Sequence, residues 1–453
     1  MSVLDKILEI YKKYYICSHC LGRMFALLGT NTTNFERGGS LLLSLLIDNH
    51  ANYLSHDKKL ESNAIDNLKI LAEYANFIPA QKVLEYEGIE YKKFSNEKVC
   101  HLCRDIFNNL EKYVKRAKEL IEDINFNNFL VGTTPDSQII NNEDIFKAEL
   151  NLLNSESFKS HFNRVIGKML TNELNKSANF ENPEIVFVYK INYNEFSVEL
   201  KIKSIFIAGK YNKFIRGIPQ TKWICKKCLG TGCELCNYTG KKYETSIQEL
   251  ISPEFVKESM ASDTKFHGAG REDIDVRMLG SGRPFILELK NPKIRRLNLD
   301  KIQELTNKIQ TEKVRINDLR YSDKNEVIQI KMNAENTRKS YKVLVQADKD
   351  LDLTEFNNKV IVLKNRLENQ KISQRTPTRV SHRRADLIRE KTIFNIKEKY
   401  IEPKLFEFVI ETQGGTYIKE LVSGDNARTT PSFSEIFGVP LTCKELDVIN
   451  IEK

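Results

Sequence analysis

The sequence lacks any apolar run long enough to cross a lipid bilayer. Its longest, Leu41–Ile47, is broken by Ser44 and is typical of a buried helical turn. The N-terminal stretch MSVLDKILEIYKKYY has neither the apolar centre nor the small-residue cleavage site of a signal peptide. These absences predict a cytoplasmic protein with no membrane partner.

Glycine-rich loops for organic cofactors are also missing. There is no GxxxxGK[ST] phosphate loop, no GxGxxG spacing at the start of a helix, and no SGGxDS motif for ATP. The chain has no internal repeat and no low-complexity tract. We therefore expect an ordered protein that works without an organic cofactor.

What the sequence does contain is enough apolar surface for several cores and a modest basic excess. Its 453 residues are 41% hydrophobic, which favours two or three domains. The net charge of +9 is compatible with a polyanionic partner. Residues Lys371–Phe394 hold seven Lys or Arg against two acids, together with Ser and Thr, and these residue types bind phosphate oxygens.

Eight of the nine cysteines form four CxxC pairs, and Cys443 stands alone. A CxxC turn directs two thiolates at one tetrahedral ion, and a second pair completes its shell. Disulfides are the weaker explanation in the cytoplasm. Four half-sites can combine in three ways into two structural zinc sites. The short Leu-Gly-Thr-Gly spacer favours one site from the later two pairs and one from the earlier two. The expected ligands are Cys17, Cys20, Cys100, Cys103, Cys225, Cys228, Cys233 and Cys236.

Hydrophobic periodicity divides the chain into a helical N-terminal part and later strands. Ile7, Ile10 and Tyr11 mark one helical face, and Ser155–Ser177 is typical of a helix. Strands are predicted where β-branched and aromatic residues gather. They are Phe129–Thr133, Ile185–Ile191, Phe196–Ile202, Ile205–Ala208, Phe285–Leu289, Val327–Ile330, Tyr341–Gln346, Val360–Leu363 and Leu405–Glu411.

Basic and aromatic residues alternate in Gly209–Pro219. Cations such as Lys210 and Arg216 would bind RNA phosphates there, while the aromatic rings stack on bases. The pattern fits an ordinary strand-to-loop exit equally well. His267–Glu288 combines four glycines with acids and arginines just before a strand, which is typical of a functional loop.

At this loop the chain resembles a known family. Gly270–Val276, GREDIDV, resembles the GRxDxxV signature of pseudouridine synthases. The longer string REDIDVRMLGSGRPF resembles the archaeal and eukaryotic family that acts on positions 54 and 55 of the tRNA TΨC arm. Three later segments agree with that family, and Phe206–Gln220 resembles the end of a THUMP domain, an RNA-binding module. The three segments are Lys339–Tyr341 (KSY), Arg375–Asp386 (RTPTRVSHRRAD) and Gly415–Leu421 (GTYIKEL).

The resemblance implies an α+β fold in which successive domains of the chain have different functions. Residues 1–220 would form a zinc-bound, THUMP-containing RNA-binding domain, and residues 221–245 a cysteine-knuckle linker. Residues 246–453 would form a catalytic domain with a mixed, largely antiparallel sheet. The family's zinc ligands match the first two cysteine pairs.

The resemblance also implies roles for single residues. Asp273 would act at the ribose of a flipped-out uridine, with Lys419 as its cationic partner. Tyr341 would stack on the uracil or help to remove its C5 proton, and Arg271 would fill the vacated stack or hold a phosphate. Further RNA contacts are expected from Tyr417, Arg375, Arg379, Arg383 and Arg384.

The implied reaction breaks the C1′–N1 bond of uridine and joins C1′ to C5, without redox change. The carboxylate either attacks C1′ or removes the C2′ proton, and the sequence does not choose between these. Asp275 is the alternative nucleophile, since it lies two residues from Asp273. Modification of position 54, 55 or both stays open. The expected partner is tRNA, with no obligatory protein partner.

Three other functions fit parts of the sequence. A non-catalytic zinc protein that binds RNA explains the cysteines and basic segments, but leaves the Asp, Tyr and Lys motifs unexplained. A THUMP-bearing methyltransferase or sulfur transferase needs a cofactor or ATP loop. A DnaJ-like chaperone is suggested only by a single CxxCxGxG match.

Overall fold

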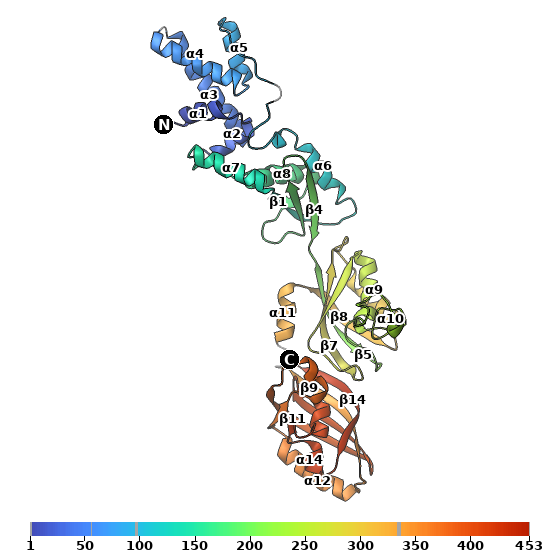
Figure 1. Cartoon of the computed structure of the whole chain (residues 1–453). Helices are drawn as coiled ribbons and strands as arrows, with labels where there is room; N and C mark the ends of the chain where they lie inside the picture. The colour runs from blue at the N-terminus through green and yellow to red at the C-terminus, as the bar shows by residue number, and fades with distance from the viewer. Residues whose placement is uncertain (1, 56, 96–97, 333–336, 453) are drawn as a thin grey trace. The chain divides into compact units, whose positions relative to one another are not determined.

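The computed structural model describes residues 2–55, 57–95, 98–332 and 337–452. The chain forms two compact units, Met1–Lys203 and Ser204–Lys453. Both units mix helices and strands (Figure 1), which confirms the α+β class. Among the described residues, every helix is too short or too polar to span a membrane.

Helices dominate the first unit. Helix α1 begins with a capping box between Ser2 and Asp5, and it buries Ile7, Ile10 and Tyr11 as its periodicity predicted. The helices are α1 (Val3–Lys13), α2 (Ser18–Met24), α3 (Asn34–Leu54), α4 (Lys58–Glu73), α5 (Ile78–Tyr86), α6 (Glu111–Glu119), α7 (Ser137–Glu149) and α8 (Phe158–Leu174), with a short 3₁₀ turn η1 (Ile106–Asn108).

A four-stranded sheet completes the first unit. Its order is β2-β1-β3-β4, with β1 parallel to both β2 and β3, and β3 antiparallel to β4. The strands are β1 (Asn128–Pro135), β2 (Ser177–Ala178), β3 (Ile185–Ile191) and β4 (Phe196–Ile202). Helix α8 packs on β1, and Phe129, Phe162 and Phe187 are fully buried in the core. The strand predictions at 185–191 and 196–202 are confirmed to the residue.

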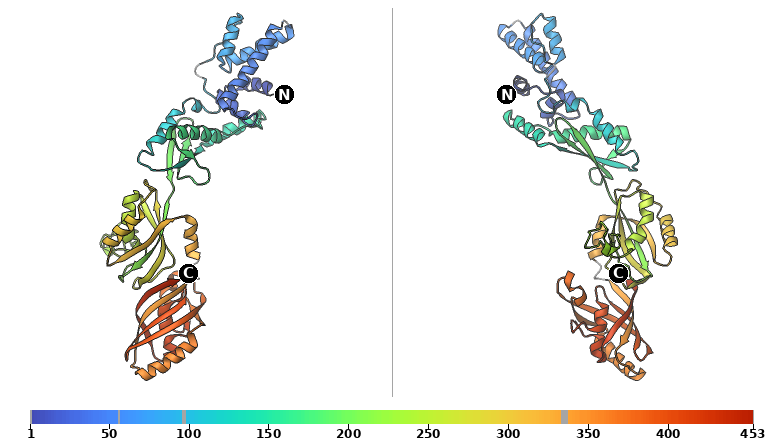
Figure 2. Two further views of the ribbon diagram at one scale, coloured as in Figure 1. Left: turned by 180° about the vertical axis from the view of Figure 1, so that it is seen from behind. Right: turned by 45° about the vertical axis from the view of Figure 1, so that its right-hand side comes forward.

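The second unit is built on a ten-stranded sheet (Figure 2). The order is β13-β10-β11-β12-β9-β14-β7-β5-β8, and β6 also pairs with β7. Among the named strands that the structure describes in this sheet, β14 pairs with β7 in parallel and the other pairings are antiparallel, so the sheet is largely antiparallel, as expected. The strands are β5 (Ile205–Lys213), β6 (Asp263–Gly268), β7 (Arg277–Lys290), β8 (Val314–Ser322), β9 (Arg338–Ala347), β10 (Gln370–Arg375), β11 (Ile388–Glu402), β12 (Leu405–Gln413), β13 (Thr429–Thr430) and β14 (Leu441–Glu452).

Helices cover this sheet and supply part of its core. Phe356 of α12 stacks on Phe406 of β12 at 4.6 Å between ring centroids. The helices are α9 (Ile247–Ser259), α10 (Leu299–Ile309), α11 (Lys324–Met332), α12 (Leu353–Leu367), α13 (Ile418–Ser423) and α14 (Phe433–Phe437), with 3₁₀ turns η2 (Glu234–Cys236) and η4 (Thr378–Arg383).

Two strand predictions are wrong. Val327–Ile330 lies in α11, and Val360–Leu363 lies in α12. In α12 the buried residues are Phe356, Val360, Leu363 and Leu367, which follow a helical period, and a capping box at Asp352 starts the helix. A short β-branched run was mistaken for a strand because its helical partners lie outside the run.

Strand β5 belongs to the second unit. It pairs with β7 on one side and β8 on the other, so it lies inside the large sheet. The sequence had assigned these residues to the RNA-binding domain through residue 220, whereas the compact units divide after Lys203. The residues that directly follow β5 therefore lie beside the loop between β6 and β7.

Candidate active site

The loop between β6 and β7 carries the GREDIDV motif. Gly270 adopts a φ of +82°, which disfavours residues with a side chain, and a Cβ atom there would lie 3.2 Å from Nη1 of Arg283. The amide of Val276 then donates to the carbonyl of Asp273 at 3.1 Å and closes a turn. This turn presents the Asp273 side chain to a cavity of about 730 Å³.

A buried polar cluster supports the loop from behind. Both carboxylate oxygens of Glu272 accept from the hydroxyl of Tyr211, at 2.7 and 2.9 Å. Glu272 also pairs with Nε of Arg283 at 2.8 Å, and Arg283 donates to the carbonyl of Ala269. Gln220 donates to the Tyr211 hydroxyl at 2.9 Å. With every one of these side chains buried, the loop has little freedom to move.

Two cations from the β5 exit hold three consecutive carbonyl groups of the loop. The ammonium of Lys213 donates to the carbonyls of Ile274 at 2.8 Å and Asp273 at 3.4 Å. The guanidinium of Arg216 donates to the carbonyl of Asp275 at 2.7 Å. Burial lowers the pKa of Lys213 to about 8, although the negative charges of Glu272 and Asp275 oppose that shift.

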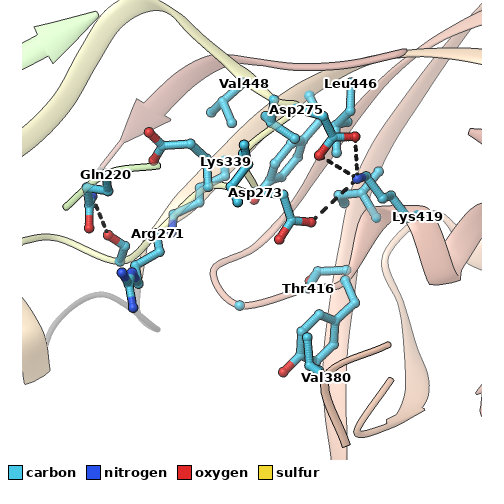
Figure 3. A pocket seen from close by; sticks show the side chains of 18 of the residues that line it. Gln220, Arg271, Asp273, Asp275, Lys339, Val380, Thr416, Lys419, Leu446 and Val448 are labelled. Carbon is cyan, nitrogen blue, oxygen red and sulfur yellow. Dashed lines mark hydrogen bonds and ion pairs between the residues drawn. The ribbon is translucent and has the colours of Figure 1, made fainter. Parts of the chain in front are cut away.

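The carboxylate of Asp273 lies between two cations from other segments. Nη1 of Arg379, in η4, is 3.0 Å from both of its oxygens. Nζ of Lys419, at the start of α13, is 3.6 Å from Oδ2 (Figure 3). Lys419 is closer to Asp275, at 2.7 and 2.8 Å. Arg379, which the sequence analysis expected to bind the RNA backbone, is therefore closer to Asp273 than Lys419 is.

The two aspartates differ in surroundings. Both aspartates line the cavity, where the side chain of Asp273 is 32% exposed, whereas that of Asp275 is 64% exposed and is held by Lys419. Burial raises the pKa of Asp275, but the hydrogen bonds and charge of Lys419 more than offset this and leave the pKa below its usual value. Asp273 has the more enclosed position and the larger number of cations around it.

Strand β9 forms another wall of the cavity. Tyr341 is 9% exposed, and burial raises the pKa of its hydroxyl to about 12. Lys339 lies two residues earlier on the same face, is 6% exposed, and lines the same cavity. Burial lowers the pKa of Lys339 to about 8, with Arg283 and Lys391 adding to the shift. A phenol and an ammonium group therefore accompany the carboxylate.

The remaining predicted residues fall into two groups. Arg271, Tyr417 and Arg384 line the cavity, where Arg384 donates to the Tyr417 hydroxyl at 2.8 Å. Lys210 pairs with Asp318, and Arg375 pairs with Asp386; neither lines the cavity. The side chain of Arg383 lies outside the described residues.

Sequence reasoning missed how several residues support the site, since it expected Lys213 only as a phosphate contact and Arg283 only as an ion-pair or phosphate contact. Lys213, Gln220, Glu272, Arg283 and Lys339 are all buried, and each lines the cavity or contacts its loop. Glu272 and Lys339 lie inside the GREDIDV and KSY motifs, so their position in the sequence could have indicated that they belong to the site. Lys213 and Gln220 become informative only once β5 is known to lie beside the loop.

The cysteines assemble into two groups of four, in the pairing that the spacer favoured. Cys17, Cys20, Cys100 and Cys103 form one buried group, and Cys225, Cys228, Cys233 and Cys236 form the other. Within each group all sulfur atoms lie within 4.8 Å of one another. Contacts such as 3.7 Å between Cys17 and Cys103, or 3.9 Å between Cys225 and Cys233, match a tetrahedral zinc, whose sulfurs lie roughly 3.8 Å apart. Both donor sets fit structural zinc.

Comparison with known proteins covers the whole chain. The family model "Pus10, C-terminal" matches residues 206–452, and "Pus10 THUMP domain, archaeal" matches residues 113–190. A "tRNA pseudouridine synthase Pus10" from Methanocaldococcus jannaschii is 42% identical over 98% of this chain and 93% of its own length. One from Ignisphaera aggregans is 34% identical over the full length of both.

Solved structures give only a weak likeness. A chain of the "Crystal Structure of a Cbf5-Nop10-Gar1 Complex" aligns over 45% of each chain at 16% identity, with a TM-score of 0.27. A TM-score this low does not establish a shared fold. The family models and the relatives carry the assignment: the chain belongs to the Pus10 family.

Proposed function

We propose that the chain is a tRNA pseudouridine synthase that uses Asp273 as its catalytic carboxylate. The observation that carries this is the enclosed position of Asp273, 3.0 Å from Arg379 and 3.6 Å from Lys419, in a cavity shared with Tyr341. The curated relatives act, by their names, on tRNA. The cavity volume of about 730 Å³ is large enough for a flipped nucleotide.

In the proposed reaction, Asp273 acts at the ribose of the flipped uridine, either attacking C1′ or removing the C2′ proton. The C1′–N1 bond breaks, and the bonding electrons stay on the uracil ring. The ring turns and a bond forms between C5 and C1′, while the bond from Asp273 to C1′ breaks or the C2′ proton is returned to the ribose. The C5 proton then leaves, and N1 takes up a proton. Arg379 and Lys419 orient the carboxylate and offset its negative charge. No oxidant or energy source is required.

Tyr341 and its neighbours are proposed to hold the base. The Tyr341 ring supplies an apolar face for uracil, and its hydroxyl stays protonated near neutral pH because burial raises its pKa to about 12. Arg271, Tyr417 and Arg384, which line the same cavity, are proposed to contact the nucleotides next to the target. Arg375 and Lys210 lie at the surface and would contact the RNA backbone further away.

The finer substrate assignment follows the family resemblance. Uridine 54, uridine 55 or both, in the TΨC arm, are the proposed targets. We propose that the first unit binds the tRNA and that each cysteine group holds one structural zinc, without an open coordination position. Residues 221–245 would then serve as a zinc-stabilised insertion between β5 and α9.

The test compares wild type with Asp273→Ala and Asp275→Ala on an unmodified tRNA transcript, without added cofactor. Pseudouridine is measured in the digested RNA, and binding is measured by filter retention. We expect product from wild type and from Asp275→Ala, and none from Asp273→Ala, which should still bind tRNA within a few-fold. Product from Asp273→Ala but not from Asp275→Ala would transfer the catalytic role to Asp275. Binding without product by folded wild type would favour a non-catalytic RNA-binding protein.

A further inference from the structure

A second groove lies in the first unit, beside the first cysteine group. It has a volume of about 400 Å³. Its walls come from two segments that are far apart in the sequence, residues 11–15 and 98–104, together with Tyr74 at the end of α4. Residues 113–190 match the THUMP model, so the groove lies outside that module.

The cysteine group holds the two segments together. The amide of Cys17 donates to Sγ of Cys100 at 3.3 Å, and the amide of His101 donates to the carbonyl of Tyr15 at 2.8 Å. The rings of Tyr14 and His101 lie 4.4 Å apart. Any ion that ties the four thiolates therefore also fixes the walls of the groove.

The groove combines aromatic rings with cations that form no ion pair with the described residues. Tyr74 is 41% exposed, and Nζ of Lys98 lies 5.2 Å from its ring centroid. Lys12, Lys98 and Arg104 are exposed and form no ion pair within the described part of the chain. The neighbouring Lys13 is neutralised by Glu149 at 3.0 Å. Among the described residues, three cations without an ion pair thus accompany the tyrosine rings, and Lys98 and Arg104 lie over aromatic rings.

This combination matches the chemistry of unpaired nucleotides. A base offers a flat face that stacks on tyrosine, and the phosphates on either side need cations with no competing carboxylate. A double helix hides its base faces and would use only the cations. An acidic peptide would use the cations and leave the rings without partners. The volume is within the range of about 300–1,000 Å³ for small-ligand pockets.

We propose that this groove binds unpaired nucleotides of the RNA substrate. Bases stack on Tyr74 and Tyr15, and phosphates contact Lys12, Lys98 and Arg104. The identity of that RNA as tRNA rests on the proposed function, but the groove's preference for single strands does not. The first unit would thereby recognise a single-stranded region of the substrate, apart from the uridine that reacts in the second unit.

The experiment uses the full chain with Tyr74→Ala and Lys98→Ser combined, since both side chains are exposed. The matched control combines Tyr86→Ala and Lys58→Ser, an exposed tyrosine and lysine of the same unit outside the groove. The probes are a fluorescein-labelled single-stranded RNA hexamer, an RNA duplex of similar length, and a tRNA transcript. Fluorescence anisotropy gives the affinities, and circular dichroism verifies folding.

We expect the groove variant to bind the hexamer and the tRNA about tenfold more weakly, as loss of one stacked base predicts. Binding of the duplex should change little, and the control should match wild type. Unchanged hexamer binding overturns the proposal, and so does an equal loss for the duplex. Pseudouridine formation is measured in parallel over a range of tRNA concentrations, and the groove variant should need about tenfold more tRNA than wild type for half of its maximal rate. Failure of wild type to form pseudouridine would refute the proposed function and leave the binding comparison intact.

Discussion

The carboxylate of Asp273 lies between Arg379 and Lys419, which come from segments 40 residues apart along the chain. Arg379 also donates through Nε to Glu420 at 2.7 Å, so its orientation is fixed before any substrate arrives. Because it contacts both oxygens of Asp273, it orients the carboxylate as well as neutralising it. We interpret Arg379 as part of the catalytic machinery.

Arg379→Gln tests this role against a simple RNA contact. If Arg379 orients Asp273, the single-turnover rate at saturating tRNA falls by about a hundredfold, the size expected for losing one preorganised donor. If it contacts only phosphate, the affinity falls and depends less on salt, while the rate at saturation stays unchanged. Arg366→Gln is the matched control, because Arg366 of α12 forms an exposed pair with Glu435 of α14.

Lys339 makes a pH-dependent contribution to stability. Its folded-state pKa is about 8, below the value of roughly 10.4 for an unfolded lysine. Between these two values the unfolded chain keeps a proton that the folded chain has lost. The free energy of unfolding therefore rises with pH across that window, and below it this contribution is flat.

Lys339→Met removes this titration. We expect the stability of wild type, relative to the variant, to increase between about pH 8 and 10. Urea denaturation of the two proteins at several pH values measures the difference. A difference that is constant with pH, or one that falls, contradicts the assigned pKa and its cause.

At the scale of elements, the end of β5 and the loop after β6 are held together by hydrogen bonds. Lys213 and Arg216 leave β5 and bind the carbonyls of Asp273, Ile274 and Asp275. The side chain of Arg216 also reaches Asp447 of β14 at 2.7 Å. Through Lys213 and Arg216, the end of β5 and the residues after it therefore connect the loop that carries Asp273 to the parallel pair of β7 and β14.

Lys213→Met tests whether this assembly positions the loop. Loss of the two hydrogen bonds from Lys213 to the loop should displace Asp273 and lower the single-turnover rate roughly ten- to a hundredfold. The affinity for tRNA should stay within a few-fold, since Lys213 is 1% exposed. Lys301→Met, on the exposed face of α10, serves as the control. An unchanged rate in folded Lys213→Met protein would show that the loop holds its position without these contacts.

The two cysteine groups stabilise different amounts of structure. The first joins residues 17–20 to residues 100–103 and is fully buried, whereas the second closes a short loop that is partly exposed. We expect two zinc ions for each chain, and one each in Cys100→Ser and Cys228→Ser. Cys100→Ser should lower the thermal stability of the first unit strongly, because the zinc ion would no longer link residues 17–20 to residues 100–103 in the buried core.

Atomic absorption gives the zinc content and calorimetry gives the transitions. Cys228→Ser should affect only the local loop and leave the main transition nearly unchanged. Two zinc ions retained in Cys100→Ser, or an unchanged transition, would contradict a structural role for the first group. Cys443, which belongs to neither group, provides the control as Cys443→Ser.

The sequence predicted the site through motifs that lie on one element each. The motifs GREDIDV, KSY and GTYIK contain Asp273, Tyr341 and Lys419, and all three residues line the cavity. Each motif lies within one loop, one strand or one helix start, so its residues stay close together in the fold. Contacts between elements were not predictable in this way. That Arg379 rather than Lys419 makes the shortest contact with Asp273 depends on how η4 and α13 pack against the sheet. The helical nature of α12 was missed for a similar reason, since its buried partners extend beyond the apolar run.

At the scale of the whole molecule, the chain has two compact units with different surfaces. The first carries a groove lined by tyrosines, lysines and an arginine, and the second carries an enclosed carboxylate with its cations and a buried tyrosine. A substrate that contacts both must be a large polyanion with a reactive nucleotide that can leave its stack. Transfer RNA meets these requirements, and the family relatives carry its name.

The measurement that tests the central claim most directly is tritium release from a tRNA transcript labelled at C5 of its uridines. Formation of a C1′–C5 bond expels that hydrogen, so release reports the reaction itself. We predict single-turnover release by wild type, without added cofactor, and none by Asp273→Asn, which keeps the size of the side chain and removes its charge. Release by Asp273→Asn at the wild-type rate would contradict the assignment of Asp273, and bound tRNA that releases no tritium with wild type would contradict the proposed activity.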